Sequence, residues 1–119
     1  MCEISRESNI DKVIDIKKDL YMNLYSNESE MNKVISHITL SSAILGLPKS
    51  IKFNGDNMCI EIEMNKEYVD TFDVKMIECV AAEAFQDYFR MRGKNYDANF
   101  TRMLFSIVLK TDNIVLIKL

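Results

Sequence analysis

The sequence predicts an α+β protein in which helices pack on a four-stranded antiparallel sheet. Two observations predict this fold class. Apolar residues recur every three or four positions in three segments and every second position in four others, and the segments follow the order α-α-β-β-α-β-β. Two strand pairs separated by one helix are typical of α+β rather than α/β folds. The 119 residues fit a single domain, 1–119.

The first two periodic segments predict an antiparallel pair of helices. We expect Ser8 to cap the first helix, whose apolar side runs over 10–25. A short polar segment then interrupts the pattern and offers a second cap at Ser29. We expect the second helix to end at Gly46, because a glycine followed by Pro48 is a usual helix stop.

The segment after Pro48 changes to a period of two residues and predicts a hairpin. Ile51 and Phe53 alternate with polar neighbours, and the turn signal Asn54-Gly55-Asp56-Asn57 follows. The return strand has Met58, Ile60, Ile62 and Met64 on one side and Cys59, Glu61, Glu63 and Asn65 on the other. This alternation predicts one face on the core and one face in water.

The last part of the chain predicts a third helix and a second hairpin of different character. Acidic residues precede a helix expected over 74–89, and cationic residues follow it around Gly93, as the helix dipole favours. Strands expected over 100–109 and 114–119 are joined by a turn at 111–113. The closing strand is apolar on both sides, which is typical of a strand that is covered twice.

This closing hairpin predicts a partner chain. Three helices have to cover two faces of the sheet, and monomers seldom leave bare an apolar patch of more than roughly a few hundred Å². We therefore expect a homodimer or a permanent partner, with helices on both faces of a monomer as the alternative. The residues expected at the interface are Leu104, Val108, Val115, Ile117, Leu119 and Cys59.

Composition and charge argue against several classes of function. The formal net charge is −3, so there is no broad basic field and nucleic acid is a poor default partner. Three irregularly spaced cysteines and one histidine predict neither a disulfide framework nor a zinc site, and free thiols favour the cytoplasm. We also expect no cofactor, no membrane span and no signal peptide.

Two single side chains are candidate reactive groups. The histidine, His37, is of the residue type that most often acts as a general base, but no nucleophile or orienting acid can be identified, so an ordinary helix residue is the favoured interpretation. Cys79 lies between Glu78 and Glu83 rather than beside cations, which favours a packing role over a reactive thiolate.

Two charged clusters are candidate surfaces. The acidic one contains Glu61, Glu63, Glu67, Asp70 and Asp73. A solvated face is its favoured interpretation, with a docking surface for a basic partner or a Mg²⁺ site as sharper alternatives. The basic one contains Arg90, Arg92, Lys94 and Arg102, with aromatic residues interleaved. Such a cluster can bind single-stranded nucleic acid, but helix capping and core packing are favoured here.

The absence of a catalytic motif favours a non-enzymatic protein–protein interaction module of adaptor, immunity, inhibitor or phage or viral effector type, acting through a surface as a homodimer. The codon bias implied by abundant Ile, Asn, Lys and Met suits an AT-rich genome. One alternative is a ligand-binding or small enzymatic domain with a pocket between the third helix and the sheet, walled by Met58, Met64, Met76 and Met103. Another is a nucleic-acid-associated subunit that uses the Arg90–Arg102 cluster.

Overall fold

The computed structural model describes residues 2–42, 48–65 and 74–119, with side chains from residue 10 onward. Its elements are α1 (Cys2–Leu20), η1 (Tyr21–Tyr25), α2 (Glu28–Ser42), β1 (Ser50–Asn54), β2 (Cys59–Glu63), α3 (Val74–Met91), α4 (Ala98–Arg102), β3 (Ser106–Leu109) and β4 (Ile114–Lys118). The predicted α+β order is confirmed, with one short additional helix, α4.

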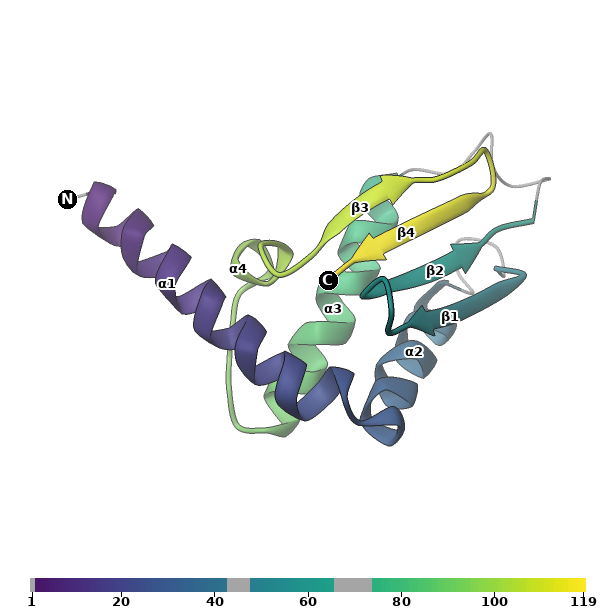
Figure 1. Cartoon of the computed structure of the whole chain (residues 1–119). Helices are drawn as coiled ribbons and strands as arrows, with labels where there is room; N and C mark the ends of the chain where they lie inside the picture. Colours follow the sequence, from purple (N-terminus) through teal and green to yellow (C-terminus); the bar gives the residue numbers. More distant parts are fainter. Residues whose placement is uncertain (1, 43–47, 66–73) are drawn as a thin grey trace.

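The strands form one antiparallel sheet in the order β1-β2-β4-β3. Helices α2 and α3 lie on the same side of this sheet, and none of the described helices lies over the opposite face (Figure 1). The register places Ile60 of β2 opposite Ile117 of β4, and Ile62 opposite Val115. These four side chains point to the helices and are buried, so the sheet has one core face and one outer face.

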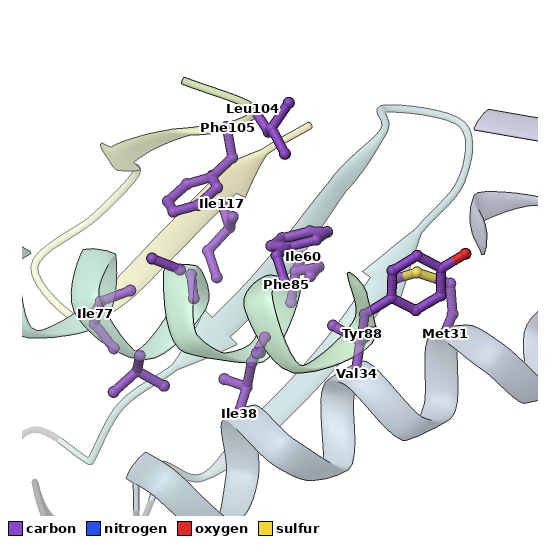
Figure 2. Packing of buried hydrophobic residues seen from close by; sticks show 14 of the residues in the cluster. Met31, Val34, Ile38, Ile60, Ile77, Phe85, Tyr88, Leu104, Phe105 and Ile117 are labelled. Carbon is purple, nitrogen blue, oxygen red and sulfur yellow. The ribbon is translucent and has the colours of Figure 1, made fainter. Parts of the chain in front are cut away.

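The core has two layers, the sheet and a layer of two helices, in which α2 contacts β1, α3 contacts β3, and the two helices pack against each other. Figure 2 shows Ile60 and Ile117 pointing from the sheet toward α3, and Ile38 pointing from α2 toward the same helix. Phe85 of α3 stacks on Phe105, just before β3, with ring centroids 5.7 Å apart. The buried side chains form one continuous cluster, which holds the two hairpins and α2 on a common helix, α3.

The N-terminal region differs from the prediction at both expected caps. Helix α1 begins at Cys2 and runs through Ser8, since no proline or glycine interrupts that stretch. It continues into the π-helical turn η1, and the Asn27 side-chain oxygen accepts a hydrogen bond from the Glu30 backbone N–H at 3.2 Å. Asn27 is therefore the cap of α2, and Ser29 lies inside the helix. The stop expected at Gly46 lies outside the described residues.

The segment expected to begin the third strand is helical instead. The carboxylate of Asp97 accepts a hydrogen bond from the Phe100 backbone N–H at 2.7 Å, which caps α4. Because this cap stabilises a helical turn, β3 begins only at Ser106, and Met103 is exposed rather than part of the strand.

The described helices cover the closing strand on one side only (Figure 1). Val115 and Ile117 are buried in the core, whereas Ile114 and Leu116 point to the outer face and are half-buried.

The first hairpin turn is confirmed, because the Asn54 side-chain oxygen accepts hydrogen bonds from the backbone N–H groups of Asp56 and Asn57.

Candidate functional site

A cleft of about 230 Å³ between α2 and α3 brings titratable side chains together. Its walls come from residues spaced three or four apart on the facing sides of the two helices. They are Glu30, Lys33, Val34 and His37 of α2, Ala84, Asp87, Tyr88 and Met91 of α3, and Arg92. The cleft is smaller than the pockets of roughly 300–1,000 Å³ that hold drug-sized ligands, so it fits only a small polar molecule.

His37 has an acidic neighbour that the sequence pattern did not reveal. Its Nδ1 lies 3.6 Å from Oδ2 of Asp87 on α3, whereas its Nε2 is buried and has no hydrogen-bond partner among the described residues. A carboxylate beside an imidazole is one half of a general-base arrangement. Among the described residues that line the cleft there is no serine, threonine or cysteine to act as a nucleophile.

Tyr88 and Arg92 form the other end of the cleft. The Tyr88 hydroxyl is buried without a hydrogen-bond partner among the described residues, and burial raises the pKa of this group while the Arg92 charge partly offsets the effect. The Arg92 guanidinium lies over the Tyr88 ring at 4.5 Å and within 3.5 Å of the Glu30 carboxylate. Lys33 also pairs with Glu30, at 3.2 Å, so both cations already have an acidic partner.

The pocket expected between the third helix and the sheet is not formed by the methionines proposed for it. Met64 is buried in the core, Met58 is half-buried, and Met76 and Met103 are exposed. These side chains do not share a wall. The space between α3 and the sheet is filled by side chains such as Phe85 and those of the central strands (Figure 2).

The acidic surface is neutralised where the structure describes it. Glu61 and Glu63 point to the outer face of the sheet, with Lys110 Nζ 4.0 Å from Glu61 and Lys49 Nζ 3.6 Å from Glu63. Lys52 lies directly across from Glu61 in the register. Both glutamates of this strand therefore have a lysine beside them. Glu67, Asp70 and Asp73 lie outside the described residues.

The basic cluster is divided between two places. Arg90 and Lys94 are exposed near the end of α3, while Arg102 lies beside Glu78 (3.4 Å) and its guanidinium donates to the Cys79 sulfur at 3.2 Å. Cys79 and Arg90 are separated by about 16 Å along the helix axis. The cluster does not form one continuous basic patch.

The interleaved aromatic residues pack against one another. Phe89 and Tyr96 have ring centroids 4.8 Å apart, and Tyr96 and Phe100 5.1 Å apart. Lys12 of α1 lies 5.1 Å from the centroids of both Tyr96 and Phe100. These rings support the fold and α1, and they do not form a free platform on which bases could stack.

Four of the six residues expected at an interface are buried within this chain. They are Leu104, Val115, Ile117 and Cys59. Their apolar character is explained by the chain's own core, so they do not supply the exposed surface that we expected of them. Leu119 is half-buried, and Val108 is exposed on β3.

The sequence interpretation missed an exposed apolar stripe on α1. Ile16, Leu20 and Leu24 are buried against the body, whereas Ile10 and Ile14 are each 47% exposed. By helix geometry the exposed stripe lies about 100° around the axis from the buried one. The signal was present in the sequence, because the apolar residues of 10–25 span an arc wider than one packing contact can use.

None of the described helices has both the length and the apolar character needed to cross a bilayer. Among the described side chains, no group of three or more His, Cys, Asp or Glu is placed to hold a metal ion. No protein-family model matches the chain, and neither a curated protein nor a solved structure matches it.

Proposed function

We propose that this chain is a non-enzymatic protein–protein interaction module that presents α1 to a partner. The observation that carries the proposal is the exposed apolar stripe of Ile10, Ile14 and Tyr21 on a helix that extends away from the rest of the fold (Figure 1). The stripe is separate from the side of the helix that packs on the body, so a partner can cover it without disturbing the core.

The placement of α1 suits recognition by a partner protein with an apolar groove. Amphipathic helices bind such grooves through anchors spaced three, four or seven residues apart, and Ile10 and Ile14 are four apart. Asp11 and Lys18 are exposed around the stripe, so both charge signs are available at the rim of the groove. The contact of Lys12 with two aromatic rings helps to hold α1 at a defined angle to the body.

The test is affinity capture with the wild-type chain, the double variant Ile10→Glu/Ile14→Glu, and Asp15→Ala as a matched control on the polar side of the same helix. We expect the double variant to lose captured partner at least about tenfold, because glutamates would be buried in an apolar groove. The control should capture normally. Far-UV circular dichroism and urea unfolding should be nearly unchanged in both variants, since the altered side chains are exposed.

A captured partner that the double variant retains in full would contradict this function. So would a wild-type chain that captures nothing above background from the cells that produce it.

A second candidate function is the binding of a small polar ligand in the α2–α3 cleft. The observation that favours it is a pair of buried polar atoms in the walls of one cleft, Nε2 of His37 and the hydroxyl of Tyr88, which have no hydrogen-bond partner in the part of the chain that the structure describes. A screen of small anions and nucleotides by thermal shift tests it. A saturable shift that His37→Ala removes, and that Asn32→Ala on the same helix but outside the cleft retains, would support this candidate.

A further inference from the structure

The β3 strand is an edge of the sheet and contains neither the charged residues nor the proline that usually protect such a strand from pairing. It contains Ser106, Ile107, Val108 and Leu109, with no charged residue and no proline. Val108 is 37% exposed and Leu109 is 56% exposed. Edge strands present unpaired backbone groups to other chains, and proteins usually blunt them with charges, proline or a covering element.

The backbone N–H and C=O groups of Ile107 and Leu109 point away from β4, outward from the edge of the sheet. The N–H of Lys110 donates to the Ile114 carbonyl at 2.8 Å, so Lys110 is directed toward β4. Because backbone groups alternate sides along a strand, Val108 also bonds to β4, whereas Ile107 and Leu109 are directed outward. Among the described residues, no strand pairs with this outward edge.

The backbone hydrogen bonds between β4 and β2 confirm that backbone groups alternate sides along the strands. The N–H of Met64 donates to the Asn113 carbonyl at 2.7 Å, and the N–H of Leu119 donates to the Met58 carbonyl at 3.0 Å. Odd-numbered residues of β4 therefore bond to β2, which leaves the even-numbered ones for β3.

We infer that a second copy of this chain pairs with this edge, β3 against β3 and antiparallel, about a two-fold axis at Val108. Residues opposite each other in an antiparallel pair must point to the same face. The register centred on Val108 meets this condition and places Ile107 opposite Leu109 of the second copy. It also lets the outward N–H and C=O groups of these two residues bond to each other, about four hydrogen bonds in all.

This register is self-complementary in its side chains. Val108 meets Val108 on the outer face, Ile107 meets Leu109 on the helix side, and Ser106 meets Lys110, so no like charges are opposed. A shift of the centre to Ile107 would place Ser106 opposite Val108, and a shift to Leu109 would place Val108 opposite Lys110. Both shifts oppose apolar and polar side chains, so the Val108-centred pairing of two identical strands is favoured.

Size-exclusion chromatography with light scattering tests the pairing over micromolar to submillimolar concentrations. We expect the wild type to approach twice the chain mass of 13.8 kDa. Val108→Lys and Val108→Glu should each have the mass of one chain, because like charges would lie directly opposite each other. Mixing these two variants should restore a particle of two chains, since lysine then faces glutamate. Val108→Thr, which adds no charge, should remain a dimer.

A backbone variant tests the hydrogen bonds separately. In Leu109→Pro the lost N–H is one that points outward, so the ladder with β4 stays intact while two of the intermolecular bonds disappear. We expect the dimer to dissociate at least about tenfold more readily, since lost hydrogen bonds weaken association. Circular dichroism identifies any variant that fails to fold.

The inference is overturned if the wild type is monomeric over the whole range, if Val108→Lys remains a dimer, or if the mixture of Lys and Glu variants stays monomeric. Ile10→Glu/Ile14→Glu should remain a dimer, so a failure of the proposed function and a failure of this pairing give different results.

Discussion

The two edge strands of the sheet, β1 and β3, differ in the side chains that they carry and in the residues that pack on them. Phe53 of β1 lies against Tyr25 of η1 with ring centroids 6.3 Å apart, and α2 covers the strand on the same side. On the outer face β1 carries Lys52, which is exposed. In contrast, β3 carries only uncharged residues, and two of its four side chains, Val108 and Leu109, are exposed and apolar.

This difference shows that exposed backbone groups alone do not make an edge strand pair with another chain. Both strands direct alternate N–H and C=O groups outward, and each is contacted by a helix on its core side, β1 by α2 and β3 by α3. Of the two strands, β1 carries a lysine, which discourages pairing with another chain, whereas the four residues of β3 are uncharged. The contrast predicts that substitutions at β1 act mainly on the stability of the monomer, and substitutions at β3 act mainly on association.

The largest effect is expected for Phe53→Ala at β1. Phe53 is half-buried against Tyr25 and the turn at Gly55, so its truncation should reduce the free energy of unfolding by about 2–3 kcal/mol, slightly below the range for fully buried phenylalanines. Urea unfolding measures this, in the Val108→Lys background so that self-association does not contribute. A loss below about 0.5 kcal/mol would show that the helical cover of β1 is loose.

A smaller effect is expected for Tyr25→Phe, which changes only the residue that covers β1. The Tyr25 hydroxyl is buried and has no hydrogen-bond partner among the described residues. Its removal should therefore raise the free energy of unfolding at neutral pH by about 1 kcal/mol. Equal stabilities of the two proteins in urea at neutral pH would indicate that the hydroxyl is solvated after all.

The same substitution should change the response to alkali. Burial, with a smaller contribution from the nearby Tyr88, raises the pKa of Tyr25 in the folded chain. The fold therefore favours neutral Tyr25, and this contribution is complete below pH of about 10 and is lost as the pH rises toward the folded pKa. Urea unfolding from about pH 9 to about pH 11 should show a steeper loss for the wild type than for Tyr25→Phe. Parallel losses would contradict the assignment.

The smallest effect is expected for Leu109→Ala at β3. This side chain is mostly exposed, so in the Val108→Lys monomer the free energy of unfolding should change by no more than about 0.5 kcal/mol. In the otherwise wild-type chain the same substitution should weaken the dimer measurably by light scattering. A large loss of monomer stability would mean that β3 is held by its side chains as firmly as β1 is.

The fold could be predicted because its signals are local. The Asn54-Gly55 turn and the alternation from Ile60 to Met64 predicted the first hairpin, and the structure has it. The errors arose where a local signal competed with the apolar pattern. Asp97 caps α4 and shortens β3, and Asn27 caps α2 in place of Ser29.

The candidate sites were less predictable, because they depend on residues that are distant in the sequence. His37 and Asp87 are on different helices and meet only when α2 packs on α3. Glu61 and Lys110 likewise meet across two strands of the sheet. No spacing rule connects such residues, so the sequence could identify neither an acid beside His37 nor a lysine beside Glu61.

The sequence by itself determined the class of fold, the order of the elements and which residues of each strand alternate, because turns, caps and apolar periods act over a few residues. Only the tertiary structure decided which apolar side chains the chain uses for its own core. Val115 and Ile117 are buried under α3, whereas Ile14 and Val108 are not fully covered. Periodicity can show that a residue is apolar, but its burial depends on which other element packs against it.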